Sequence, residues 1–288
     1  MISIIIIVKN DRGVRNTLSS LQKILKREKI EVIVIDASEG ILDDIRNTFS
    51  NVKWITFSSK SKKKISIPEQ RNIGVNAAKG DIIVFVDANC IPKKDWLINI
   101  TKPILKEDEH LVCGRTISEG SKTIHDQSYD ASQNKKYIDE CATINLAIKK
   151  EVFKKVGKFD EGFEYGSDVD FTWRAIDAGY KIRYASNAVI SHNWGDSKQE
   201  AKRSFRYGLA RARLYKKHVD KLPRLFKKDY YILIYVLFLL LLPLAIIWPY
   251  YLLFIFIPFA KNYNKQPLQV LRDHFIYALG FIKGVVLK

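Results

Sequence analysis

The start of the chain contains the feature that most restricts its fold. Ile2 to Val8 is an almost continuous run of isoleucine and valine, broken only by Ser3. Consecutive side chains of a strand point to opposite faces, so an apolar run of this kind must be covered by protein on both sides. No basic segment precedes the run and no small-residue cleavage site follows it, so we expect a buried strand and not a signal peptide.

Helical and strand-like segments alternate after this run. We expect helices at Arg15 to Lys26, Asp43 to Phe49 and Pro68 to Ala78, and strands at Glu31 to Ile35, Val52 to Phe57 and Ile82 to Val86. This alternation predicts an α/β fold with a Rossmann-like, mostly parallel, twisted sheet flanked by helices. In such sheets ligands bind beyond the carboxyl ends of the strands, where Asp36 and Asp87 are expected.

The pattern becomes mixed between Pro92 and Gly195. We expect helices at Trp96 to Leu105, Val152 to Val156 and Asp168 to Ala178, strands at Leu111 to Ile117 and Lys181 to Ser191, and a polar loop from Ser118 to Glu140. The cysteines Cys90, Cys113 and Cys141 lie far apart and lack CxxC spacing. We therefore expect neither a zinc site nor a disulfide framework, and a reducing compartment.

Composition changes abruptly near residue 197. The formal net charge of +17 indicates polyanionic partners, and Lys198 to Lys228 contains only two acidic residues. Its helix, predicted at Glu200 to His218, carries Arg203 and Arg206, which are candidates for contact with phosphates or anionic lipid headgroups, or for a solvated basic face.

An uncharged run, Tyr230 to Ala260, follows the basic segment. It exceeds the ~20 residues that one membrane span needs. Because Pro243, Pro249 and Pro258 interrupt it, we expect either one long, kinked transmembrane helix or a shallow membrane hairpin. Basic residues on both sides favour two cytoplasmic ends, and so a hairpin.

The predicted organisation is a catalytic domain at 1–196, a basic connecting helix at 197–229, the hydrophobic segment at 230–260 and an amphipathic C-terminal helix at 261–288. A membrane is thus the expected partner of the basic surface, and no nucleic-acid partner is expected.

Polar residues at the ends of the predicted strands are the candidates for chemistry. Asp87-Ala88-Asn89 supplies carboxylate and amide oxygens of the kind that Mg²⁺ and Mn²⁺ prefer, although it also suits a simple turn. Asp36 is suited to a nucleobase or ribose, and Arg71 to a nucleotide phosphate. His192 is either a structural residue or a further metal ligand.

Asp168 is the candidate general base, since sugar transfer needs a carboxylate near the acceptor hydroxyl. The alternative is structural: Ser167 and Asp170 have the spacing of a capping box at the start of a helix.

In their order along the chain, these pieces resemble the family 2 glycosyltransferases, which have the GT-A type fold. The resemblance is carried by Asp36, Arg71-Asn72-x-Gly74, the strand leading into Asp87-Ala88-Asn89, Gly157-x-Phe159-Asp160-Glu161, Asp168-x-Asp170 and Ala178-Gly179-Tyr180. It implies transfer from a nucleotide-diphospho-sugar with inversion in one displacement. By position it assigns Asp36, Arg71 and Asp87 to the nucleotide-sugar, Asp87, Asn89 and His192 to a divalent metal, Mn²⁺ or Mg²⁺, and Asp168 to the base.

Two departures from the family pattern stand out. Asn89 replaces the second Asp of the metal motif, and Ser167 replaces the Glu of a Glu-Asp pair. The Gln-x-x-Arg-Trp signature of processive synthases is absent, which favours the addition of one sugar. The expected acceptor is a lipid-linked or membrane-proximal glycan, with the catalytic domain on the cytoplasmic face of the membrane.

Two alternatives remain open. A degenerate, non-catalytic scaffold is consistent with Asn89 and Ser167. A sugar-phosphate nucleotidyltransferase has a related sheet but usually a more glycine-rich loop than Asn10-Asp11-Arg12-Gly13.

Overall fold

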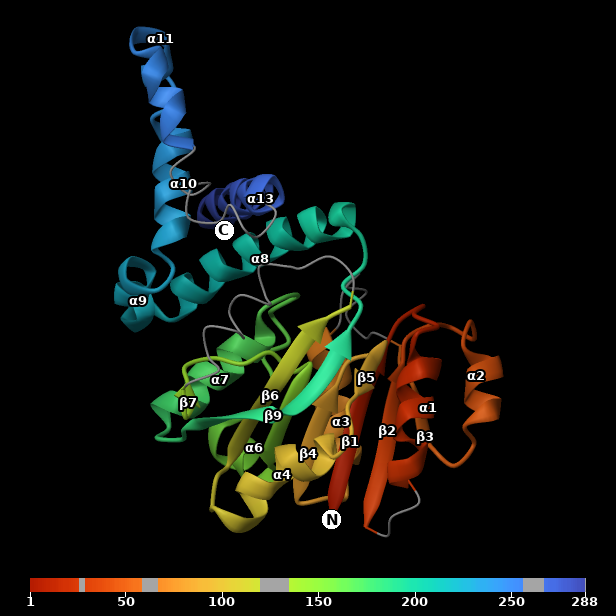
Figure 1. The fold of residues 1–288 in the computed structure, drawn as a ribbon. Helices are drawn as coiled ribbons and strands as arrows, with labels where there is room; N and C mark the ends of the chain where they lie inside the picture. Colours follow the sequence, from red (N-terminus) through yellow and green to blue (C-terminus); the bar gives the residue numbers. More distant parts are fainter. Residues whose placement is uncertain (26–28, 59–66, 120–134, 256–266, 288) are drawn as a thin grey trace. The chain divides into compact units, whose positions relative to one another are not determined.

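The computed structural model describes residues 1–25, 29–58, 67–119, 135–255 and 267–287. These residues form two compact units, which divide between Asn193 and Trp194 (Figure 1). We call the described residues up to 193 the sheet unit and those from 194 onwards the helical unit. The predicted loop Ser118 to Glu140 lies largely outside the described residues, as do Pro258, Lys261 and Lys265.

The first half of the sheet unit is the predicted parallel α/β arrangement. Strands run in the order β3-β2-β1-β4 and all neighbours are parallel. Their bounds are β1 Ile2–Val8, β2 Ile30–Asp36, β3 Lys53–Thr56 and β4 Ile82–Val86. The connecting helices are α1 Val14–Leu25, α2 Asp43–Thr48 and α3 Ile67–Ala77. The apolar runs of β1, β2 and β4 are mostly buried because helices cover both faces of these strands.

The second half of the sheet mixes parallel and antiparallel pairs, so the predicted parallel arrangement describes the first half and not the whole sheet. Its strands are β5 Cys90–Pro92, β6 Leu111–Ser118, β7 Tyr137–Ile138, β8 Asn145–Lys149 and β9 Ile182–His192. The chain returns through β8 between β4 and β6, and it is antiparallel to both. β9 is parallel to β6, whereas β5 and β7 are antiparallel to β9. Helices α4 Trp96–Lys106, α6 Lys150–Val156 and α7 Ser167–Asp177 complete the unit.

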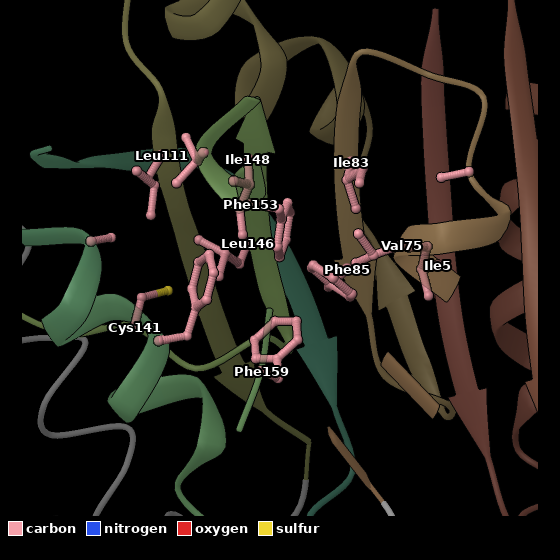
Figure 2. Close-up of a cluster of buried hydrophobic side chains, with 14 of the residues drawn as sticks. Ile5, Val75, Ile83, Phe85, Leu111, Cys141, Leu146, Ile148, Phe153 and Phe159 are labelled. Atoms are coloured by element: carbon pink, nitrogen blue, oxygen red, sulfur yellow. The ribbon is translucent and has the colours of Figure 1, made fainter. Parts of the chain in front are cut away.

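An aromatic cluster joins β4 to the helices that follow β8. Figure 2 shows Phe85, Phe153 and Phe159 close together beside these strands. The ring of Phe85 meets that of Phe159 edge-on at 5.5 Å between centroids, and Phe153 stacks on Phe171 at 4.9 Å. Such pairs add about 0.5–1.5 kcal/mol each beyond their buried area. The cluster therefore fixes α6 and α7 against the strand that ends at Asp87.

A disulfide joins Cys113 and Cys141, so the expectation that the cysteines are not paired was wrong. Their Cα atoms are 6.2 Å apart although 28 residues separate them in sequence. Cys113 lies opposite Leu146 in the β6–β8 pairing, and Cys141 lies shortly before β8. The spacing along the sequence gave no sign of this pair because the return of β8 beside β6 brings the two residues together.

The helical unit is built on two long helices, α8 Ser197–Lys217 and α13 Pro267–Val286. They approach closely at glycines: a Cβ on Gly208 would lie 2.0 Å from the carbonyl oxygen of Tyr277, and one on Gly280 2.1 Å from that of Phe205. A capping box formed by Asp196 and Gln199 starts α8.

The uncharged run does not form the long helix that was one of the two predictions. It folds as α10 Tyr230–Leu240, α11 Leu244–Ile247 and the 3-10 helix η2 Pro249–Ile255, after η1 Val219–Lys221 and α9 Leu222–Lys227. The break follows Leu240 and precedes Pro243, whose ring is incompatible with a helix interior. Within the part of the chain that the structure describes, no helix is both long and apolar enough to cross a membrane.

Candidate active site

Asp36 and Asp87 lie at the same edge of the sheet, as predicted. Asp36 is the last residue of β2 and is paired with Val8 of β1, while Asp87 directly follows β4, which pairs with β1 on its other side. Two strand spacings, roughly 10 Å, therefore separate the two strand ends. Asp36 is buried and its Oδ1 accepts a hydrogen bond from the amide of Ser38 at 2.9 Å.

The Asp87-Ala88-Asn89 turn is held in an unusual backbone conformation. Asn89 has φ of 62°, in the left-handed region, which asparagine tolerates better than most residues. The loop after β1 lies against it, since a Cβ on Gly13 would be 2.6 Å from the Asn89 side chain. Gly13 therefore leaves the space that the Asn89 side chain occupies.

His192 is brought to this turn by strand pairing. Cys90, the residue after Asn89, begins β5 and is paired with His192, the last residue of β9. Antiparallel pairing thus places His192 beside the turn although the two are far apart in sequence. Burial raises the pKa of the neighbouring Cys90 thiol, which keeps that thiol protonated and unreactive.

The electrostatic environment of Asp87 joins four of the predicted site residues. Burial raises the pKa of Asp87 above its usual value, the charges of Arg71 and His192 oppose this rise, and the carboxylate of Asp168 adds to it. Arg71, Asp168 and His192 therefore all contribute to the electrostatic environment of Asp87. Asp36 lies at the same edge, two strands away.

Arg71 is fixed in place by the helix that carries Asp168. It is buried on α3, its Nη1 donates to Ser167 Oγ at 3.3 Å, and its guanidinium lies 5.7 Å from the centre of the Phe159 ring. Ser167, which stands where the family pattern has Glu, thus accepts a hydrogen bond from Arg71.

Asn72 is a residue of this site that the reasoning from individual residues missed. Its side-chain amide donates to the Phe159 carbonyl at 2.9 Å and to Glu161 Oε1 at 2.8 Å, and its Oδ1 accepts from the Phe159 amide at 3.0 Å. It therefore clamps the Gly157-x-Phe159-Asp160-Glu161 segment to α3. Its place beside Arg71 in the sequence was the available signal.

Asp168 lies in the first turn of α7, but the capping-box alternative for its neighbours is wrong. The N-cap is Gly166, with no side-chain cap, and Ser167 is inside the helix. Asp170 is fully buried and pairs with Arg174 at 2.9 Å instead. The carboxylate of Asp168 is half-buried: Oδ1 accepts from the Val169 amide at 2.9 Å and Oδ2 from the Thr143 amide at 3.4 Å.

The metal candidates are Asp87, Asn89 and His192, which meet at one turn. Among the described residues, no group of three or more His, Cys, Asp or Glu side chains is arranged to hold a metal ion. The set nevertheless fits a hard divalent cation, because it offers two oxygen donors and an imidazole, and Mg²⁺ or Mn²⁺ commonly takes its remaining ligands from substrate phosphates and water.

Arg203 and Arg206 belong to the helical unit. Arg203 Nη2 lies 2.6 Å from Glu200 Oε2 and donates to the Trp194 carbonyl at 2.6 Å. Arg206 is exposed on α8. Contact of either residue with phosphate or lipid stays a prediction.

The profile of glycosyl transferase family 2 matches residues 3–164, a segment that contains Asp36, Arg71, Asp87 and Asn89. This chain belongs to glycosyl transferase family 2. It is therefore a glycosyltransferase, as predicted. Asp168 and His192 lie beyond the matched segment and are placed by the structure alone.

Curated relatives of this family 2 chain have low sequence identity to it, but their matches extend over most of the chain. A glycosyltransferase named AglE, from Haloferax volcanii, is 26% identical over 81% of this chain and 80% of its own length. The pre-mycofactocin glycosyltransferase of Mycobacterium tuberculosis is 27% identical over 72% of this chain and 47% of its own length. This chain thus spans about half the length of the mycobacterial relative.

Solved structures confirm that the family 2 chain has an α/β, GT-A-like fold. The mannosyltransferase PcManGT from Pyrobaculum calidifontis, solved with GDP-Man and Mn²⁺, superimposes with a TM-score of 0.69 at 16% sequence identity. The match covers 99% of this chain and 87% of that structure. At this identity the likeness concerns the fold.

Proposed function

We propose that this glycosyltransferase moves one sugar from a nucleotide-diphospho-sugar to a hydroxyl of a lipid-linked or other membrane-proximal glycan, with inversion at the anomeric carbon. The observation that carries the proposal is the geometry at the carboxyl edge of the sheet: strand pairing puts Asp36 and His192 at the same edge as Asp87, and Arg71 is hydrogen-bonded to the helix that carries Asp168. One part of this group suits a diphosphate, and a separate carboxylate is left to accept a proton.

The donor would lie along the sheet edge from β2 to β4. Asp36 would accept hydrogen bonds from the nucleoside, and the diphosphate would lie near Asp87, roughly 10 Å away, a spacing that suits a nucleoside diphosphate. Arg71, which is held by Ser167 and Phe159, would pair with phosphate oxygens.

A divalent cation, Mn²⁺ or Mg²⁺, would be held by Asp87, Asn89 and His192. When bound, it would neutralise charge on the departing nucleoside diphosphate. Support comes from the donor types of these side chains and from the Pyrobaculum mannosyltransferase, which was solved with GDP-Man and Mn²⁺. The neutral Asn89 amide contributes an oxygen without charge, so we expect weaker metal binding than with a second carboxylate.

Asp168 would act as the general base. It would take the proton of the acceptor hydroxyl as that oxygen forms its bond to the anomeric carbon and the bond to the diphosphate oxygen breaks. Attack from the face opposite the leaving group inverts the configuration.

We further propose that the reaction takes place at the cytoplasmic face of a membrane. Lys227 and Lys228 precede the uncharged run, and Lys261 and Lys265 follow it. Under the positive-inside rule, basic flanks on both sides favour two cytoplasmic ends, which supports this proposal.

A thermal-shift screen of UDP-, GDP- and dTDP-linked sugars with Mn²⁺ tests the donor assignment. At a ligand concentration of 100 times Kd, binding stabilises the folded state by about 2.7 kcal/mol, which should raise Tm by roughly 5 °C. The shift should be lost in Asp87→Asn and kept in the control Asp81→Asn, which changes an exposed residue just before the other end of β4.

Two outcomes would replace the proposal. If no nucleotide-sugar raises Tm, with or without Mn²⁺, the result would support the non-catalytic scaffold. Release of pyrophosphate from a nucleoside triphosphate and a sugar phosphate would support a nucleotidyltransferase.

A further inference from the structure

The helical unit carries an apolar hairpin, which we define as Tyr230–Ile255. α10 runs outward, α11 lies at its far end, and η2 returns (Figure 1). The two arms are held together because the Tyr251 ring stacks on Phe238 at 5.1 Å between centroids and its hydroxyl donates to the Phe238 carbonyl at 2.9 Å. The hairpin contains no charged residue.

The far end of the hairpin exposes apolar side chains to an extent that is unusual for a protein in water. Ile246 and Ile247 are 86% and 85% exposed. Other large apolar residues of the hairpin are also exposed, namely Ile234, Leu237, Leu240, Leu241, Leu242, Leu244, Trp248, Leu252, Leu253 and Phe254. A continuous apolar surface of this kind marks contact with a membrane or with another protein.

The polar backbone of the turn is satisfied from within, which is the requirement for a segment in hydrocarbon. Amides of the turn donate to carbonyls of the same segment; they are those of Leu241, Leu242, Leu244, Ala245, Ile246 and Trp248. The two prolines of the turn, Pro243 and Pro249, have no N–H to satisfy. A surface made to bind another protein through water-exposed loops has no need of this arrangement.

The base of the hairpin is cationic. Lys227 and Lys228 are exposed immediately before α10. The adjacent acid, Asp229, is buried, accepts a hydrogen bond from the Tyr215 hydroxyl at 2.6 Å and lies 3.6 Å from Arg211. Its negative charge is therefore withdrawn from the surface. The exposed Phe226 directly precedes the two lysines, so an apolar group and two cationic groups lie together at the base, a combination that suits the headgroup region of a membrane.

We propose that the hairpin inserts into one leaflet of an anionic bilayer, with Lys227 and Lys228 at the lipid phosphates, and does not cross the membrane. α10 is the longest helix of the hairpin, and its eleven residues extend for about 16 Å, too short to cross a hydrocarbon core of about 30 Å. The inference concerns the helical unit alone and holds or fails independently of the donor that the sheet unit binds.

Flotation of the full chain with vesicles tests the partner. We expect the protein to rise with vesicles of phosphatidylcholine containing 30% phosphatidylglycerol, and to bind pure phosphatidylcholine more weakly. Replacing both base lysines (Lys227→Gln, Lys228→Gln) should weaken partitioning to the anionic vesicles roughly 30-fold, because each cation near such a surface contributes about 1 kcal/mol.

A matched pair of double variants separates the hairpin from general stickiness. Ile246→Glu with Ile247→Glu should abolish flotation, whereas Ile41→Glu with Leu105→Glu, which changes two exposed apolar residues of the sheet unit, should leave it intact. Equal loss in both variants would overturn the proposal. The proposal would also be overturned if the wild-type chain did not float with vesicles but formed a dimer. Loss of that dimer in the Ile246/Ile247 variant would then assign the surface to contact with a second copy.

Lipids with brominated acyl chains measure depth. Quenching of tryptophan fluorescence should be present in the wild type and largely lost in Trp248→Phe, because Trp248 is the only tryptophan of the hairpin sequence. A Trp248 that is quenched only by a soluble quencher such as iodide in the presence of bound vesicles would contradict insertion.

Discussion

Two apolar runs of this chain look alike in sequence and end in opposite environments. In Ile2–Val8 of the sheet unit, Ile4 and Ile6 are fully buried, whereas Ile246 and Ile247 of the hairpin are more than four-fifths exposed. Strands on both sides and helices on both faces cover the first run, whereas α13 packs against part of α10 and leaves Ile246 and Ile247 of the second run uncovered. Apolar side chains favour an environment without water. Whether the protein itself provides that environment depends on the elements that pack against the run.

The two units also differ in how they expose acidic and amide side chains. The sheet unit keeps Asp87, Asn89 and Asp168 half-buried at one edge, within reach of a ligand. In the helical unit, two acids are buried beside arginines: Glu200 pairs with Arg203, and Asp273 lies 2.6 Å from Arg272. This difference is consistent with the two proposals, chemistry in the sheet unit and membrane attachment by the helical unit, and substitutions in each unit test that division.

The largest expected effect is on chemistry in the sheet unit. Asp168→Asn should reduce transfer by about 10³-fold, because removal of a general base costs typically 10²–10⁴ in rate, while nucleotide affinity stays within about twofold. Single-turnover assays and calorimetry measure the two quantities. The control Asp177→Asn makes the same change in the last turn of α7. Undiminished turnover in Asp168→Asn would remove this residue from the base role.

A smaller effect is expected where the sheet unit holds its site together. Asn72→Ala removes three hydrogen bonds and leaves the buried amide and carbonyl of Phe159 without them. We expect a loss of about 3 kcal/mol in unfolding free energy and weaker nucleotide binding, measured by denaturant unfolding and by calorimetry. Unchanged stability would show that the clamp has no energetic role.

The helical unit should respond separately. A methyl group at Gly280 would meet the Phe205 backbone, so Gly280→Ala should destabilise the α8–α13 pair by about 2 kcal/mol while leaving nucleotide affinity unchanged. Hydrogen exchange resolves the two units, and Leu279→Ala, at the half-exposed neighbouring position, is the control. A parallel fall in nucleotide affinity would break the proposed division of labour.

The smallest effect concerns the metal. His192→Gln should weaken Mn²⁺ binding in the presence of nucleotide by about tenfold, because one of several ligands is lost while the carboxylate stays. The midpoint of a Mn²⁺ titration, followed by thermal shift, measures this. His110→Gln, which changes a histidine beside Glu151, is the control. An unmoved midpoint in His192→Gln would contradict the ligand assignment.

Local patterns predicted the elements well. Ile82–Val86 was predicted with its observed bounds, and most other elements differ by one or two residues, because apolar periodicity and turn residues act over short distances. The carboxyl-edge positions of Asp36 and Asp87 followed from that alternation.

Long-range pairing was the part that local patterns missed. The return of β8 between β4 and β6 decides both the mixed sheet and the Cys113–Cys141 bond, and it depends on contacts between distant segments. Asn72 was missed for the same reason, since its partners lie on a segment nearly ninety residues away. The break after Leu240 was among the alternatives because Pro243 signalled it.

The pairing of Cys90 with His192 makes the reaction centre depend on strand alignment. β5 has three residues, so few hydrogen bonds hold it in register with β9. β6 holds His192 in place through its own pairing with β9, so a slip of β5 by one position would shift the Asp87-Ala88-Asn89 turn relative to His192. Metal binding at the proposed site would then weaken although all of the proposed ligand residues are still present in the chain. Substitutions at Pro92 or Ile190, which touch no ligand, can therefore inactivate the enzyme by misalignment.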